Sequence, residues 1–424
     1  MHVEKKVTDA ILEVKDYNGV YVNRTPIVNV GGVPLFMHEV ALAGILARLN
    51  MVFIGRSGPG KSQLIADITN GLFNGEAVHL RGSTDLKVRP VYCSVDIELL
   101  KKGKFDEAVK PRKNAQKMLH IMEEFNRTPP VIQNDWLAVA DGVLDIDGTQ
   151  IPIQGQGYSI AIGAANVGNG EFSGTFQTDN ALKERLVLAL DFDGLNKPRE
   201  MDYFDIFEAS SDPRVVASEK KDRKDQITRL HREVRKIASE ADYLLRMMQI
   251  YLVKGLDEVE IGNRTYSKEE IPNLGAVVAG DSKASKDILN YMMPPSVRAA
   301  KVFGSLAPAL AVIAMAKGAD SDAALADGCS SALQLILPFS DSLPKKVISD
   351  NKGSRRLAAT AIAEKIGAEM PTTELLVEGL RRAGEGELSD VQLKGFEKPR
   401  VRCISRFLRS LNEDSIREKA KQRR

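Results

Sequence analysis

The chain has 424 residues, of which 27% are charged and 43% hydrophobic, and this composition is that of an ordinary globular protein rather than a disordered one. Its formal net charge of +2 provides no global field that would recruit nucleic acid or a membrane surface. The length allows two or three domains.

Cysteine usage and the apolar segments indicate where the protein works. Cys93, Cys329 and Cys403 lie far apart without a C-x-x-C pair, which favours a reducing compartment and offers no metal-site spacing. The N-terminus is charged and amphipathic and lacks the apolar core of a signal peptide. The longest apolar segment, Leu306 to Ala316, contains Pro308 and is too short to span a bilayer. We therefore expect a cytoplasmic protein without a membrane partner.

A phosphate-binding loop lies between a predicted strand, Met51 to Ile54, and a predicted helix that begins with Gln63 to Thr69. The loop fits the pattern G-x-x-x-x-G-K-[ST], whose backbone N–H groups wrap phosphates while the helix N-terminus points at the same anion. Lys61 can reach the β- and γ-phosphates, and the Ser62 hydroxyl can ligate Mg²⁺. The alternative is a glycine-rich turn that binds nothing, which the strand and helix on either side disfavour. The expected nucleotide-binding residues are Gly55, Arg56, Ser57, Gly58, Pro59, Gly60, Lys61, Ser62 and Gln63.

A second apolar strand, Met118 to Glu124, ends in the pair Glu123-Glu124. In P-loop NTPases an acidic residue at the end of such a strand positions Mg²⁺, and a second carboxylate can orient and deprotonate the attacking water. The alternative is two solvated glutamates that cap a strand. The P-loop earlier in the chain favours the catalytic interpretation.

A hairpin and a third strand follow. Gly142 to Ile153 alternates around the turn signal Asp147-Gly148, which predicts a β-hairpin. Tyr158 to Ala164 predicts a buried strand that leads into Asn166. An asparagine after a strand is usually a turn residue. If this strand neighbours the P-loop strand, however, Asn166 can donate a hydrogen bond on the phosphate side.

A fourth strand completes the predicted sheet. Asn180 to Leu186 predicts a short helix that carries Arg185, and Leu186 to Phe192 predicts the strand. Strands separated by helices favour an α/β fold with a mostly parallel sheet covered on both faces. Ligands in such sheets bind at the carboxyl ends of the strands, where the P-loop, Glu124 and Asn166 are expected to lie.

The second half of the chain is predicted to be helical. Apolar residues recur at three- and four-residue spacing from Ile227 to Leu244, and Val259 to Tyr266 forms a hairpin-like break. Pro294-Pro295-Ser296 opens another helix, with Arg298 near its start. We expect an N-terminal extension over 1–30, a P-loop core over 31–209, an all-helical lid over 210–345 and a helical C-terminal extension over 346–424.

Two segments are strongly basic. Residues 101–117 are basic and loop-like, and the tail from Lys398 to Arg424 holds ten Lys or Arg and three Asp or Glu. Such a tail can bind the phosphates of nucleic acid, but a solvated basic helix is the commoner outcome.

The assembled motifs resemble the MoxR-like branch of the AAA+ ATPases over roughly residues 30–340. Gly55 to Ser62 is similar to the family's Walker A motif, and Glu123 to Asn134 is similar to its Asp-Glu-hydrophobic-Asn-Arg-x-Pro-Pro block. By this resemblance Asn166 matches sensor 1, Arg185 falls at the arginine finger, and Arg298 falls at sensor 2. The chain departs from the family at Glu123, where an aspartate is usual, and around Arg185, where the family has Asp-Arg-Phe.

The resemblance implies an ATP-driven remodelling protein with ATP and Mg²⁺ as cofactors. Such proteins form rings, usually hexamers, and act on a protein client, often with a von Willebrand factor A-type partner. Glu124, Arg185 and Asn166 would be catalytic, Arg298 would contact nucleotide, and Ser62 and Glu123 would hold the metal. The alternative is a nucleic-acid motor, such as a helicase or packaging ATPase, on the same core. A non-hydrolysing scaffold and a small-molecule kinase fit these residues less well.

Overall fold

The structure is a computed structural model that describes residues 3–56, 58, 60–146, 148–166, 184–193, 196–209, 214–240, 242–340 and 342–422. The chain divides into two compact units, one comprising Met1–Lys236 with Ser305–Gly328 and the other Ile237–Gly304 with Cys329–Arg424. This division follows packing within the chain. The boundaries that the sequence suggests near residues 30, 209 and 345 stay predictions.

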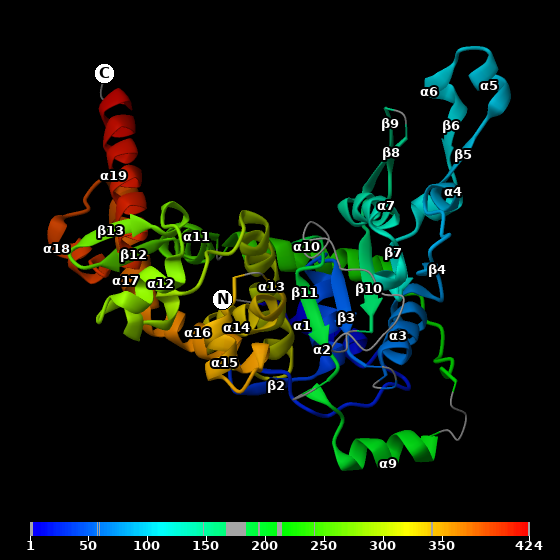
Figure 1. Cartoon of the computed structure of the whole chain (residues 1–424), viewed down its shortest axis with the longest axis horizontal. Helices are drawn as coiled ribbons and strands as arrows, with labels where there is room; N and C mark the ends of the chain where they lie inside the picture. Colours follow the sequence, from blue (N-terminus) through cyan, green and yellow to red (C-terminus); the bar gives the residue numbers. More distant parts are fainter. Residues whose placement is uncertain are drawn as a thin grey trace. The chain divides into compact units, whose positions relative to one another are not determined.

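The first unit is built on a five-stranded parallel sheet in the order β11-β3-β10-β7-β4 (Figure 1). Met51 pairs in register with Ile162 on one side and Leu188 on the other, so the P-loop strand is an interior strand, next to the edge strand β11. All six residues of β10 are buried, as expected for a sheet covered on both faces. The α/β fold is therefore confirmed, with strands β3 (Met51–Ile54), β4 (Val78–Arg81), β7 (Leu119–Glu123), β10 (Ile160–Ala165) and β11 (Leu188–Asp191).

Helix α2 (Met37–Leu46) packs directly on this sheet, and all ten of its residues are buried. A Cβ on Gly44 would lie 2.6 Å from Met51 Sδ and 2.7 Å from Leu188 Cδ2, so only glycine lets the helix approach β3 and β11 this closely. The remaining elements outside the insertions are α1 (Lys5–Lys15), β1 (Val28–Val30), β2 (Val33–Leu35), α3 (Lys61–Phe73), η2 (Phe125–Arg127), α7 (Pro130–Asp141), α9 (Glu200–Ala209) and α10 (Lys224–Glu240).

Two insertions interrupt the strand–helix alternation. Between β4 and β7 the chain forms the antiparallel pair β5–β6 with two short helices at its tip, and Figure 1 shows this pair extending away from the sheet. The expectation of a loop over 101–117 is wrong, because part of that segment is helix α6 and strand β6. Between α7 and β10 the predicted hairpin is confirmed. The insertion elements are α4 (Arg89–Tyr92), β5 (Cys93–Val95), α5 (Ile97–Lys101), α6 (Phe105–Ala108), β6 (Val109–Pro111), η1 (Lys113–Gln116), β8 (Val143–Ile146) and β9 (Thr149–Pro152).

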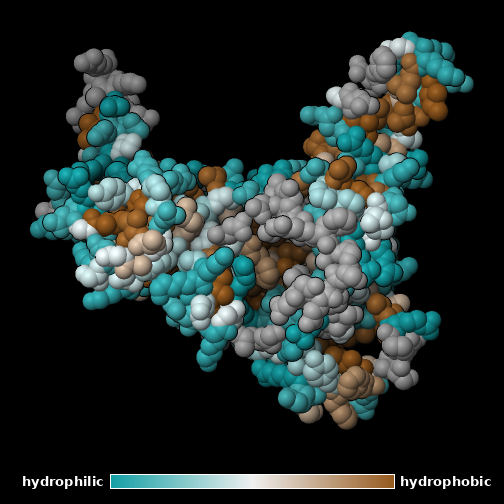
Figure 2. All heavy atoms as spheres, in the orientation of Figure 1, coloured by the Kyte–Doolittle hydropathy of each residue, from teal (hydrophilic) through white to brown (hydrophobic). Residues whose placement is uncertain are grey.

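The β5–β6 pair and helix α9 both expose large apolar side chains. Val95 and Ile97 are 46% and 65% exposed on the insertion, and Met201, Phe204 and Phe207 are 66%, 59% and 73% exposed on α9. Figure 2 shows apolar surface over both elements.

The second unit is helical apart from one hairpin. Strands β12 (Glu258–Ile261) and β13 (Arg264–Ser267) pair across the turn at Gly262-Asn263, as the sequence suggests. Val259, Val278 and Ala284 form a small core beneath this hairpin. The other elements are α11 (Asp242–Ile250), η4 (Tyr251–Gly255), η5 (Lys268–Glu270), α12 (Leu274–Gly280), η6 (Ala284–Lys286), η7 (Ile288–Asn290), η8 (Leu337–Phe339), α15 (Lys345–Asp350), α16 (Arg355–Glu369), α17 (Thr373–Glu385), α18 (Asp390–Leu393), η9 (Lys394–Phe396), η10 (Pro399–Val401) and α19 (Arg402–Gln422).

Helices α13 (Val297–Ala316) and α14 (Ser321–Ile336) contribute residues to both units. Within the described part of the chain, α13 is the one helix long and apolar enough to cross a membrane by length and composition. The helix is longer than the apolar segment Leu306 to Ala316, because it begins nine residues before Leu306 and includes Arg298 and Lys301. Most of α13 is buried inside the protein, as in the core helix of a soluble domain.

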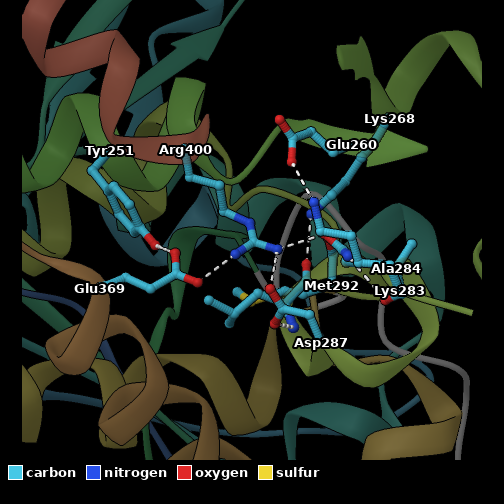
Figure 3. Close-up of polar contacts among 11 residues, drawn as sticks. Tyr251, Glu260, Lys268, Lys283, Ala284, Asp287, Met292, Glu369 and Arg400 are labelled. Carbon is cyan, nitrogen blue, oxygen red and sulfur yellow. Dashed lines mark hydrogen bonds and ion pairs between the residues drawn. The ribbon is translucent and has the colours of Figure 1, made fainter. Parts of the chain in front are cut away.

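A buried polar network holds the second unit together (Figure 3). Arg400 Nη1 lies 2.6 Å from Glu369 Oε1, and Arg400 Nη2 lies 2.7 Å from Asp287 Oδ2. The Tyr251 hydroxyl donates to the same Glu369 carboxylate at 2.8 Å. Arg400 thus ties the C-terminal region to α16 and to the segment that precedes α13. Residues beyond the family resemblance are an integral part of this unit.

The Lys268 amine lies in the same region, with its side chain 1% exposed. It donates to the carbonyls of Leu289 and Met292, at 2.6 and 2.8 Å from Nζ to oxygen. Burial, and then the neighbouring Arg400, lower its pKa to about 7, while Asp287, Asp257 and Glu369 act in the opposite direction. The folded protein therefore disfavours a protonated Lys268.

Because the pKa of Lys268 is lowered in the folded protein, we expect the free energy of unfolding to rise with pH. Between about pH 7 and the normal lysine pKa near 10.5, the unfolded chain binds the Lys268 proton and the folded chain does not, so the free energy of unfolding increases across that window. Chemical denaturation from pH 7 to pH 9.5 should show a steeper rise for the parent than for Lys268→Met. Parallel pH profiles for the two proteins would contradict this assignment.

Candidate functional site

The P-loop joins the carboxyl end of β3 to helix α3, as the sequence predicts. Gly58 and Gly60 have φ of 103° and 94°, values that glycine adopts without strain. A Cβ on Gly60 would also lie 2.9 Å from Tyr21 Cε2. Ser57 and Pro59 lie outside the described residues. The loop therefore needs glycine both for its conformation and for its contact with the N-terminal segment.

Lys61 is the first residue of α3 and is 8% exposed, and its side chain extends back to the start of the P-loop. Its Nζ donates to the carbonyls of Gly55 and Arg56, at 2.7 and 2.5 Å. Burial lowers its pKa, although Asp193, Glu123 and Asp191 oppose the shift. The Arg56 N–H donates to Asp193 Oδ2 at 2.8 Å, so the carboxyl end of β11 supports the loop. The ammonium group is thus held where an anion in the loop would meet it.

The side chains of Ser62, in α3, and Glu123, at the end of β7, are hydrogen-bonded to each other. Hydrogen bonds from His79 and then Ser62 lower the pKa of the Glu123 carboxyl, against the opposing effect of partial burial. His79 Nε2 is 3.6 Å from Glu123 Oε2. One carboxylate and one hydroxyl oxygen suit Mg²⁺, which keeps most of its ligands from water and phosphate. The described residues contain no group of three or more His, Cys, Asp or Glu that could hold a metal ion.

Glu124 follows β7 in a left-handed conformation, with φ of 53°. Its carboxylate accepts a two-point contact from Arg81 Nε and Nη2, each at 3.4 Å, and lies 3.3 Å from Arg127 Nη1. A Cβ on Gly82 would lie 2.2 Å from the Glu124 carbonyl oxygen, so glycine is required there. Sequence reasoning missed Arg81. The sequence feature that could have identified it is a basic residue at the end of a predicted strand. In the structure Arg81 pairs in register with Glu123 of the neighbouring strand.

Asn166 immediately follows β10, between the P-loop strand and β7. Asn126 is 8% exposed. Its side-chain amide donates a hydrogen bond to the backbone carbonyl of Asn166 at 3.0 Å. This bond joins the segment after β7 to the segment after β10. Asn166 is thereby fixed at the same edge of the sheet as Lys61 and Glu124.

One pocket of about 740 Å³ is lined by residues of the P-loop and by the residues that follow β7 and β10. Its walls come from residues 20–22, helix α9 and residues 214–216, which the sequence analysis did not connect with the site. Helix α9 is anchored by buried Asp202, which accepts from the backbone N–H of Arg24 at 3.0 Å and of Arg199 at 2.9 Å. The expected site residues that line the pocket are Gly58, Gly60, Lys61, Ser62, Gln63, Glu123, Glu124 and Asn166.

Four of the described residues that were expected at the site do not line this pocket: Gly55, Arg56, Arg185 and Arg298. Arg185 Nε lies 2.6 Å from Asp141 Oδ2, and Arg185 is not among the described residues that line the pocket. Most of the predicted short helix before it lies outside the described residues. Arg298 lies in α13 within the second unit, so its nucleotide-sensing role stays a prediction.

Comparison with known proteins supports the fold. No family model matches the chain, and no curated protein matches it. Among solved structures, the chain is similar to the crystal structure of a "putative ATPase" from Cytophaga hutchinsonii, with a TM-score of 0.56 and 16% identity. The similarity covers 85% of this chain and 94% of that one. The chain shares the fold of that protein. At this identity the likeness concerns the fold alone.

Proposed function

We propose that the protein is an Mg²⁺-dependent ATPase that binds ATP in this pocket. The observation that carries the proposal is the meeting of Lys61, Glu123, Glu124 and Asn166 at the carboxyl ends of adjacent parallel strands. This is the edge at which parallel α/β sheets bind their ligands. A glycine-rich turn without a ligand would not need two carboxylates and an asparagine beside it.

Each residue has a defined task in this proposal. The loop N–H groups and Lys61 bind the β- and γ-phosphates. Ser62 and Glu123 would hold Mg²⁺, which when bound neutralises charge on the phosphate oxygens. Glu124 accepts a proton from the attacking water, and Asn166 orients a γ-phosphate oxygen or that water. Because Arg81 and Arg127 contact Glu124 in the present structure, Glu124 must release Arg81 to take up the water.

We further propose that the protein is of the MoxR-like AAA+ type, acting as a ring, usually a hexamer, on a protein client. The motif order and the shared fold support this assignment. A von Willebrand factor A-type partner and a cytoplasmic location belong to the same proposal. The exposed apolar residues of the β5–β6 insertion offer a surface for the client.

The second candidate is a nucleic-acid motor, favoured by the exposed basic residues of the insertion and by the basic C-terminal helix.

Turnover of ATP by the purified chain should be measured with Mg²⁺ alone, with duplex and single-stranded DNA, with RNA, and with an unfolded protein as a client substitute. The main proposal expects turnover that nucleic acid leaves unchanged. Strong stimulation by DNA or RNA, absent with protein, would favour the motor. No turnover under any condition would refute both.

A further inference from the structure

Two neighbouring side chains of helix α3, Gln63 and Asp67, are hydrogen-bonded to two separate walls of the pocket. Asp67 is fully buried, and its Oδ2 accepts from the backbone N–H of Val20 at 3.0 Å and of Tyr21 at 2.7 Å. Its Oδ1 accepts from Gln63 Nε2 at 3.1 Å, since residues four apart on a helix lie side by side. A buried carboxylate is stable only when such donors compensate its lost hydration. Asp67 therefore ties the N-terminal wall, residues 20–22, to the P-loop helix.

Gln63 ties a second wall, residues 214–216, to the same helix. Its Nε2 donates to the Val216 carbonyl at 2.9 Å, and its Oε1 accepts from the Val216 N–H at 2.9 Å. The primary amide thus pairs with both backbone groups of one residue, and the other N–H of its Nε2 bonds to Asp67. A continuous series of hydrogen bonds consequently joins the two walls through Asp67 and Gln63. We call these two side chains the wall clamp.

The lining of the pocket is divided by chemistry. Charged and hydroxyl groups gather around the P-loop, from Lys61, Ser62, Glu123 and Glu124. The two clamped walls instead carry valines, and helix α9 adds further apolar side chains. These apolar lining residues are Val20, Val22, Ile206, Phe207, Val215 and Val216. A nucleoside triphosphate has the same division, with a polyanionic chain at one end and a planar base at the other, so the apolar lining suits the nucleoside part.

We propose that the wall clamp positions the two walls for the nucleoside part of ATP, and so sets the preference of the pocket for a nucleoside triphosphate over a bare polyphosphate. Holding both walls in place before the ligand arrives avoids the entropic cost of ordering them on binding. The hydrogen bonds of the clamp end on the walls and not on Lys61, so phosphate binding should not depend on them. This inference rests on the proposed function, because it requires a nucleotide in the pocket.

The clamp is tested by measuring the dissociation constants of ATP and of inorganic tripolyphosphate, each with Mg²⁺, for the full chain. Gln63→Leu keeps the approximate size of the side chain and the bonds from Asp67 to the N-terminal wall, but it releases Val216. It should weaken ATP binding by about tenfold, the scale of a lost hydrogen bond, and leave tripolyphosphate binding unchanged. Gln116→Leu is the matched control, because Gln116 is exposed and does not line the pocket among the described residues.

An exchange of amide and carboxylate tests whether the two side chains act as a pair. Gln63→Glu removes both donated hydrogen bonds and places a second carboxylate beside Asp67, so it should weaken ATP binding. Adding Asp67→Asn restores a donor and an acceptor between the two positions and removes the repulsion, so the double variant should bind ATP more tightly than Gln63→Glu alone. Independent structural losses would add and give no such recovery. A double variant that binds ATP no better than Gln63→Glu would overturn the pairing.

The outcomes separate this inference from the proposed function. If the parent and Gln63→Leu bind ATP equally while Lys61→Ala does not bind it, only the role of the wall clamp is wrong. Equal losses of ATP and tripolyphosphate affinity in Gln63→Leu would indicate a distorted P-loop and would also overturn that role. If the parent protein fails to bind ATP, the proposed function fails and this inference fails with it.

Discussion

Replacing Glu124 by glutamine should slow ATP hydrolysis by about a hundredfold or more, the scale of a lost general base, while ATP binding persists. Glutamine keeps the size and hydrogen-bonding capacity of the side chain and removes its basicity. The residue lies in a tight turn after β7, where Gly82 packs against its carbonyl oxygen, so its backbone position is fixed. Its carboxylate lies 3.4 Å from Arg81 Nη2 and 3.3 Å from Arg127 Nη1.

The measurement is a comparison of turnover at saturating ATP with the dissociation constant of ATP. Glu76→Gln is the matched control, because Glu76 is a carboxylate of the same unit that contacts Lys117 and Lys224 and does not line the pocket among the described residues. The control should turn over ATP as the parent does. An unchanged turnover number in Glu124→Gln would move the catalytic base to another residue.

Arg185→Ala should reduce turnover by about 10³- to 10⁵-fold if Arg185 stabilises charge on the transferred phosphoryl group of a neighbouring subunit. In the structure the guanidinium group contacts Asp141, at the end of α7, and does not line its own subunit's pocket among the described residues. The alternative is a partly exposed ion pair with little effect on activity. Arg185→Ala itself separates these possibilities, because loss of such an ion pair would leave turnover nearly unchanged. Asp141→Asn is the matched control: it weakens the pair but keeps Arg185, so activity should persist if the arginine acts as a finger.

Mixed assemblies test whether Arg185 acts between subunits. Arg185→Ala protein keeps an intact P-loop, and Lys61→Ala protein keeps an intact arginine. Rings that contain both variants would hold interfaces that pair the two intact parts, so turnover should reappear on mixing. A mixture that co-assembles but stays inactive would contradict action in trans. A fully active Arg185→Ala protein would contradict a catalytic role altogether.

The sequence predicted the parts of the site whose residues are close along the chain. A four-residue apolar strand, a glycine-rich loop and a helix in immediate succession define the P-loop, and Glu123-Glu124 ends a strongly apolar strand. The strand-end position of Asn166 also follows from local pattern. Each of these signals needs only neighbouring residues, and the parallel sheet then brings their carboxyl ends together.

The walls of the pocket could not be predicted in this way. The pairing of Gln63 with Val216 joins residues 153 positions apart, and Asp67 binds backbone groups 46 and 47 positions away. Neither contact leaves a period or motif in the sequence. Strand β6 has three residues, too few for alternation to reveal it, and this is why residues 101–117 were expected to form a loop.

The most direct test of nucleotide binding at this pocket is equilibrium dialysis of labelled ATP against the parent chain and Lys61→Ala, with Mg²⁺ present. Lys61 supplies the positive charge at the centre of the loop, so the account predicts saturable binding by the parent and none by the variant. Circular dichroism should confirm that both proteins are folded. Equal binding by the two folded proteins, or no binding by the parent, would contradict the central claim.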